Sequence, residues 1–140
     1  MAASAVTGVV AYLKTDQALA ALIGQRVFGA ELPARETAEM PRKALVVRAS
    51  GGASLFGASY VEHDTSRLDL FGFGETPFEA GRVIDRAALA MKRLRRSVHS
   101  GVLLHWAQSA GGKSSGREPA TDWPREFQSF QVLAALEEVS

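Results

Sequence analysis

Hydrophobic and polar residues alternate from Ser66 to Phe71 and then change period, which predicts a strand followed directly by a turn and a helix. Thr76 is a favourable N-cap, and Pro77 suits the first helical position. Glu79 stands three residues after this cap, as in a capping box. The helix that these signals start carries one apolar stripe, in steps of four and three, made of Ala80, Ile84, Ala87, Met91 and Leu94.

The N-terminal region shows two further helical segments. Ser4 can cap a helix over Ala5–Lys14, and the Thr-Asp pair that follows supplies a break and a new cap. A short helix over Gln17–Leu22 then ends at Gly24. The hydrophobic period by itself also permits one kinked helix across the whole region.

The remaining apolar segments predict strands. Lys43–Ala49 contains three large apolar residues in a row, as in a well-buried strand, and Tyr60–Phe71 can run antiparallel to it. The strand expected at Val102–Gln108 alternates, so that one face carries Val102, Leu104 and Trp106 and the other Leu103, His105 and Ala107. Two further strands are expected at Val27–Leu32 and Phe127–Leu136, with loops at Pro33–Pro41, Gly51–Ser59 and Ser109–Ala120.

The order of these elements indicates the fold class. Strands occur in runs instead of alternating regularly with helices, which favours an α+β fold. We expect a mainly antiparallel sheet of about four to five strands with helices packed on one face. The length suits a single domain over residues 1–140.

Composition excludes several function classes. The net charge of +1 implies no overall attraction to nucleic acid, although local patches remain possible. The chain has no cysteine, which excludes disulfides, thiolate nucleophiles and cysteine-based metal sites. No apolar run approaches the roughly 20 residues that a membrane span needs, so we expect no membrane partner.

The residues that could carry chemistry form no convincing site. Ala107–Ser114 matches a relaxed phosphate-binding loop, but Pro119 and Pro124 exclude the long helix that should follow it. No serine lies in a nucleophile elbow. The histidines are separated and lack metal-ligand spacing on a helix; they are His63, His99 and His105. We therefore expect no enzyme activity, no cofactor and no metal.

The strongest charge feature is a basic face on the helix after Thr76. At 100° per residue this face lies opposite the apolar stripe, and Glu79 and Asp85 interrupt it. It is explained equally well by a solvated surface, with cations favoured near the helix C-terminus. Contact with an acidic neighbouring subunit or with DNA is the alternative. The cations are Arg82, Arg86, Lys92, Arg93 and Arg96.

A second feature is the apolar pair Leu55-Phe56 in a segment rich in glycine, alanine and serine. If this loop is exposed, two large apolar residues at its tip favour a partner-binding surface. If the loop folds back, the same residues belong to the core. We favour the partner-binding interpretation.

Two parts of the chain resemble the tail-completion or tail-terminator proteins of tailed bacteriophages and phage-like particles. In that family an N-terminal helical segment ends in a run of leucine, a small residue, glycine, a polar residue, arginine and two apolar residues. Leu22–Phe28, with the sequence LIGQRVF, follows this run. The strand, Thr/Pro turn and long helix at Arg67–Leu94 match later elements of the family, and the resemblance covers most of the chain through the order of its elements.

The resemblance implies a structural virion protein of a phage, prophage or gene transfer agent, assembled in the host cytoplasm and located at the tail or neck. It implies a homohexameric ring that caps the tail tube and joins it to the head-side connector or neck proteins. DNA would pass through the lumen. Loop character and charge assign axial or inter-subunit contacts to Leu55, Phe56, Glu62, Asp64, Lys113 and Arg117, and lumen or neighbour contacts to the basic helix face.

Three alternatives remain open at this stage. The first is a head–tail connector of the same kind of particle. The second is a small nucleotide-binding domain or enzyme that uses Gly111–Ser114. The third is a free-standing nucleic-acid-binding domain that uses the helix cations.

Overall fold

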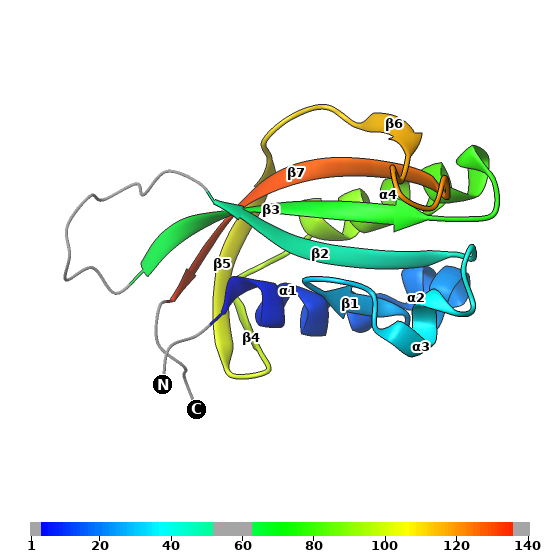
Figure 1. Cartoon of the computed structure of the whole chain (residues 1–140). Helices are drawn as coiled ribbons and strands as arrows, with labels where there is room; N and C mark the ends of the chain where they lie inside the picture. The colour runs from blue at the N-terminus through cyan, green and yellow to red at the C-terminus, as the bar shows by residue number, and fades with distance from the viewer. Residues whose placement is uncertain (1–3, 52–62, 136–140) are drawn as a thin grey trace.

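The computed structural model describes residues 4–51 and 63–135. Its helices and strands follow one another along the chain as labelled in Figure 1. The N-terminal half contains α1 (Ala5–Lys14), α2 (Gln17–Ile23), β1 (Val27–Gly29), α3 (Ala34–Thr37), β2 (Ala44–Gly51) and β3 (His63–Phe73). The C-terminal half contains α4 (Pro77–Lys92), β4 (Ser97–His99), β5 (Val102–Ser109), β6 (Ser114–Arg117) and β7 (Pro124–Ala135).

The described strands form one mixed, strongly curled sheet. Its order is β1-β2-β3-β7-β5-β4, and β6 pairs with the first residues of β7. β1 pairs parallel to β2, and the other neighbours are antiparallel, including the expected pair of β2 and β3. The α+β class is confirmed. The prediction of a mainly antiparallel sheet with four to five strands is wrong, because seven strands pair in the described part of the chain.

The strands that the sequence failed to predict are short. β4 and β6 have three and four residues, too few for a period-two pattern to stand out. β6 lies inside Ser109–Ala120, which was expected to be a loop. Its glycine and polar residues give no strand signal, and the strand forms by pairing with the apolar strand β7.

A β-bulge also corrects the expected faces of β5. The register with β7 shifts between Leu104 and Trp106. The alternation therefore changes face there, as an extra residue in one strand requires. Val102 and Leu104 are buried as expected. Beyond the shift both Trp106 and Ala107 are partly buried, and it is Ala107 that packs against the same core.

The helices α1, α2 and α4 begin where their capping residues predicted, whereas α3 lies in Pro33–Pro41, which was expected to be a loop, and has no side-chain cap. The side chain of Ser4 accepts from the backbone N–H of Thr7, and Asp16 accepts from that of Leu19 at 2.9 Å. Two separate N-terminal helices therefore form instead of one kinked helix. No single helix in the described residues is long and apolar enough to cross a membrane; α1 and α2 meet that test only as a pair bent by 87°.

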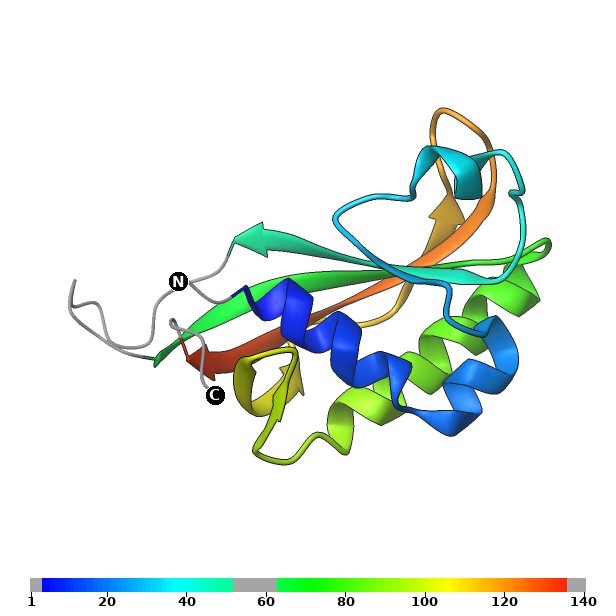
Figure 2. The ribbon, with the colours of Figure 1, turned by 90° about the horizontal axis from the view of Figure 1, so that it is seen from below.

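The helices α1, α2 and α4 cover one face of the sheet, as Figure 2 shows. The whole predicted stripe of α4 is buried there. It packs with apolar residues from both N-terminal helices and from the inner faces of the strands. The core is built around Val9, Leu13, Leu19, Ile23, Leu45, Val47, Leu68, Leu70, Leu104, Phe130 and Val132.

The contact between α4 and β3 is close at Gly72. A Cβ at this position would lie 2.8 Å from Cγ1 of Ile84 and 3.0 Å from the carbonyl oxygen of Ala80. Both atoms belong to α4, and the carbonyl is part of its backbone. The glycine therefore sets how near the helix lies to the sheet.

We expect Gly72→Ala to lower the free energy of unfolding by about 1–3 kcal/mol, because overpacking a filled core costs about this much. Urea unfolding followed by tryptophan fluorescence measures the effect. Gly112→Ala is the matched control, since no described atom lies within 4 Å of its added Cβ. Equal midpoints for Gly72→Ala and the unmodified chain would contradict the close contact.

Candidate interaction surfaces

On the predicted basic face of α4, Arg86 forms an ion pair, and the other cations pair with no carboxylate of a described residue. Arg86 donates from Nε and Nη2 to the two carboxylate oxygens of Asp16, each at 2.9 Å. Asp16 is the residue that caps α2, so this bidentate pair ties α4 to α2. Hydrogen bonding from Arg86 is the main reason that the pKa of Asp16 is lowered. Arg86 thus has a structural partner within its own chain.

The other predicted cations of α4 face solvent. Arg82, Lys92, Arg93 and Arg96 are exposed, and none forms an ion pair with a carboxylate among the described residues. Arg95, which the sequence analysis did not single out, is also exposed and hydrogen-bonds the carbonyl oxygens of Arg93 and Leu94. The end of α4 and the residues after it therefore carry several exposed positive charges, on Lys92, Arg93, Arg95 and Arg96.

Lys113 is held against α4 rather than projecting freely. Its Nζ donates to Oδ1 of Asp85 at 2.8 Å and lies 3.6 Å from Oε2 of Glu126. That oxygen is buried and has no hydrogen-bond partner among the described residues. It lies beside Gly81, where an added Cβ would come within 2.9 Å. Lys113 therefore supplies the nearest positive charge to a buried carboxylate.

The structure of this region does not match a phosphate-binding loop. Such a loop needs a helix whose N-terminus faces the phosphates. The segment Gly111–Ser114 instead leads into the strand β6, which begins at Ser114. Arg117, at the end of β6, donates to the carbonyl oxygen of Asp122 at 2.9 Å and closes the turn before β7. Both predicted contact residues of this segment are thus engaged within the chain.

The remaining predicted contact residues are only partly covered. Leu55, Phe56 and Glu62 lie outside the described residues. Asp64 lies within β3, where its backbone position pairs with Ala134 of β7. Their roles in binding stay predictions.

The histidines do not form a metal site among the described residues. His99 packs edge-on against the ring of Tyr12, and its Nε2 lies 2.8 Å from Oγ of Ser97. Burial lowers the pKa of His99. His105 is partly buried in β5. These histidines belong to the fold of the sheet and its covering helix.

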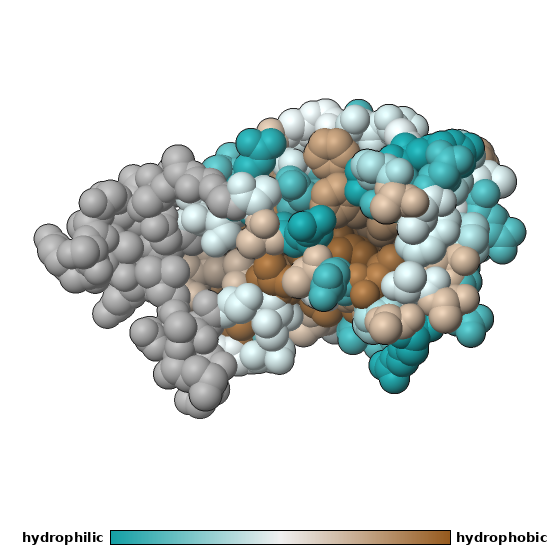
Figure 3. Space-filling model, viewed as in Figure 1, coloured by the Kyte–Doolittle hydropathy of each residue, from teal (hydrophilic) through white to brown (hydrophobic). Residues whose placement is uncertain are grey.

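An aromatic hollow on the sheet face away from α4 was not predicted. Phe71 stacks on Phe127 with ring centroids 5.5 Å apart, and Phe73 meets Trp123 edge-on at 6.3 Å. Figure 3 shows hydrophobic residues gathered in a central hollow on this face. The hollow measures about 240 Å³, and its lining includes Glu31, Val46, Arg48, Phe71, Phe73, Glu118, Trp123 and Arg125.

Two arginines lie against the rings of this hollow. The guanidinium carbon of Arg125 is 4.9 Å from the centroid of Phe71, and that of Arg48 is 5.8 Å from it. No carboxylate of a described residue pairs with either arginine. The alternation of side chains along β3 is enough to predict from the sequence that Phe71 and Phe73 share one face. The other residues of the hollow come from distant segments, so no local sequence pattern predicts that they join these rings.

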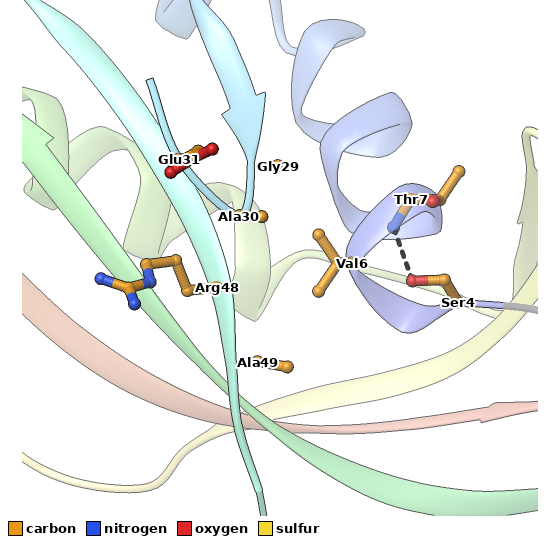
Figure 4. Close-up of a pocket in the computed structure, with 8 residues that line it drawn as sticks. All are labelled: Ser4, Val6, Thr7, Gly29, Ala30, Glu31, Arg48 and Ala49. Atoms are coloured by element: carbon orange, nitrogen blue, oxygen red, sulfur yellow. Dashed lines mark hydrogen bonds between the residues drawn. The ribbon is translucent and has the colours of Figure 1, made fainter. Parts of the chain in front are cut away.

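A larger groove of about 700 Å³ opens between the start of α1 and the end of β2. Figure 4 shows Val6 across from Ala49, with Gly29 and Ala30 at one end of the groove. β1 pairs with β2 only as far as Val47, so no described strand covers that edge of β2 beyond it. An exposed strand edge can accept an extended segment through main-chain hydrogen bonds.

We expect Arg86→Gln to destabilise the fold in a pH-dependent way. Because the pKa of Asp16 is lowered in the folded chain, the pair contributes its stability above the ordinary aspartate pKa of about 3.9. This contribution is lost as the pH falls through the lowered value. Urea midpoints of the variant and the unmodified chain should therefore differ at pH 7 and converge in acid.

Arg82→Gln is the matched control for that measurement, since Arg82 lies on the same helix, is exposed and pairs with no described carboxylate. Its midpoint should follow that of the unmodified chain at every pH. A pH-independent loss in Arg86→Gln would contradict the assigned role of Asp16.

We expect Lys113→Ala to lower the urea midpoint at pH 7, because it removes the cation nearest to the buried oxygen of Glu126. The same substitution should cost less in a Glu126→Gln background, where no buried charge remains. A double-mutant cycle of these two changes measures the coupling. A coupling of zero would show that Lys113 does not stabilise Glu126.

Comparison with known proteins supports the fold and not a named family. No protein-family model matches this chain, and no curated protein matches it. Among solved structures, the chain is similar to a chain of a structure described as "Virion of native gene transfer agent (GTA) particle". The TM-score is 0.64 at 17% identity, and the match covers 95% of this chain and 99% of that chain. The chain therefore shares, almost from end to end, a fold found in a gene transfer agent virion.

Proposed function

We propose that this chain is a structural subunit of a tailed phage or phage-like particle. The observation that carries the proposal is the almost complete overlap of its fold with a chain of a gene transfer agent virion. A shared fold alone does not define a function. The order of the motifs around Leu22–Phe28 and Arg67–Leu94 gives independent support, because it resembles the tail-terminator family.

Within such a particle we assign the chain to a ring, hexameric in the resembled family, that caps the tail tube. The mechanism is surface complementarity. One face of the ring must match the last ring of the tube, and the other must reject further tube subunits and accept the neck proteins. Ring closure needs a head-to-tail interface, so each subunit must present two different patches to its neighbours.

The exposed positive charges at and after the end of α4 suit contact with DNA in the lumen or with an acidic neighbour. They belong to Lys92, Arg93, Arg95 and Arg96. Several cations on one surface attract phosphates without reading a base sequence. Such contact is what a passage for DNA of any sequence requires. We propose that the chain works in this way without enzyme activity, cofactor or metal.

The second candidate is a head–tail connector of the same kind of particle. The structural similarity supports a connector as well as it supports a terminator, since the comparison gives no position of the similar chain within the virion. It differs from a terminator in its neighbours, because a connector contacts the head side of the neck. The two assignments therefore predict different defects when the chain is removed.

We expect removal of this chain from the producing host to release tail tubes that exceed their normal length and carry no heads. Electron microscopy of the particles measures both features, and expression of the unmodified chain should restore them. Headless tails of normal length would instead favour the connector. Normal particles without the chain would contradict both assignments.

A further inference from the structure

Phe78 is the most exposed large apolar residue of the described chain. Its exposed fraction is 76%, compared with 48% for Val98 and 36% for Leu89. It lies in the first turn of α4, on the side away from the core stripe. Burying a phenylalanine ring is strongly favourable, because the ring removes a large apolar area from water. Its position on a regular, capped helix makes it a rigid apolar knob.

The aromatic hollow on the opposite face of the sheet matches this knob in size and chemistry. Its volume of about 240 Å³ lies below the roughly 300–1,000 Å³ of pockets for drug-sized ligands. A single aromatic side chain suits it better than such a ligand. Phe71, Phe73 and Trp123 supply aromatic walls, and aromatic rings prefer one another in stacked or edge-on contact.

The charges around the two features are also complementary. Glu75 is exposed in the turn before Phe78, whereas Glu79 accepts a hydrogen bond from the backbone N–H of Glu75. Arg48 and Arg125 line the hollow, and no carboxylate of a described residue lies within ion-pair distance of either. Cations beside an apolar hollow are complementary to a protruding apolar side chain that has a carboxylate next to it.

The remaining charges fit the same arrangement. Arg82 follows Phe78 by one helical turn, and Glu31 is an exposed acid in the lining of the hollow. The other acid of the lining, Glu118, accepts hydrogen bonds from Thr121 and from the backbone of Ala120. These hydrogen bonds lower the pKa of Glu118, and the charge of Arg125 contributes to the same shift. Arg82 and Glu31 are therefore a second pair of opposite charges.

The two features are available for contact between copies. Phe73 ends β3 and lines the hollow, while Phe78 begins α4 after a short turn. Both therefore lie at one end of the molecule, but α4 packs on the sheet face away from the hollow. The exposure of Phe78 shows that it does not fill the hollow of its own chain.

We propose that Phe78 of one copy inserts into the aromatic hollow of the next copy. A knob and a hollow on different surfaces make a head-to-tail contact, which closes into a ring when the rotation per subunit permits it. The inference rests on the proposed ring function and adds to it the surfaces that join neighbouring subunits. It also assigns Arg48 and Arg125 of the hollow to inter-subunit contact.

Disulfide trapping tests this contact cleanly, because the chain contains no cysteine. Arg82→Cys, one helical turn from Phe78, is combined with Thr37→Cys, an exposed position in the lining of the hollow, so that the Phe78 ring itself is kept. The control combines Thr37→Cys with Val98→Cys, which replaces an exposed apolar residue elsewhere on the surface. All three positions are exposed, so the variants should retain the fold.

Mild oxidation of the first variant should give a ladder of crosslinked species beyond the dimer, at least about tenfold faster than the control, because contact raises the local thiol concentration. Mixing the two single-cysteine chains should give crosslinked dimers, whereas each alone should not. A ladder no faster than the control, or one that stops at the dimer, would overturn the proposal. The tail-length experiment is independent, so a failed ladder with overlong tails would remove this contact and leave the terminator assignment intact.

Discussion

The rest of the structure depends on the close seating of α4 against the long strands β3 and β7. Gly72 lets the helix backbone approach β3, and Gly81 leaves room for the carboxylate of Glu126 from β7. The apolar stripe of α4 covers part of the inner face of the sheet. Arg86 of α4 then connects this helix to α2 through its ion pair with Asp16. The same contact sets the outward direction of Phe78 and of the cations on the helix.

Because the helices α1, α2 and α4 pack on one face of the sheet, they leave its other face available for contacts with partners. The inner face is covered by α1, α2 and α4, as in other α+β domains. The outer face keeps a partly exposed aromatic cluster and two arginines without carboxylate partners in the described chain. An apolar patch that stays exposed on a folded chain is typical of a surface that binds another protein.

Local signals predicted α1, α2 and α4 well, because caps and apolar stripes act within a few residues, whereas the short α3 formed in a segment that was expected to be a loop. Thr76, Asp16 and Ser4 each marked a helix start that the structure contains. The short strands β4 and β6 and the parallel pairing of β1 could not be predicted, since each depends on a partner strand far along the chain. The pairs Arg86–Asp16 and Lys113–Asp85 are long-range as well. Of the candidate site, the free cations of α4 could be predicted from periodicity, whereas the aromatic hollow needed the assembled sheet.

The central claim is that this chain forms a single ring at the end of a tail tube. Cryo-electron microscopy of particles from the producing host, with the chain located by docking or by a label, tests it most directly. The account predicts one ring at the head-proximal end of the tube, with the aromatic hollow covered by a neighbouring copy. Absence of the chain from every particle, or its position on the capsid side of the neck, would contradict the account.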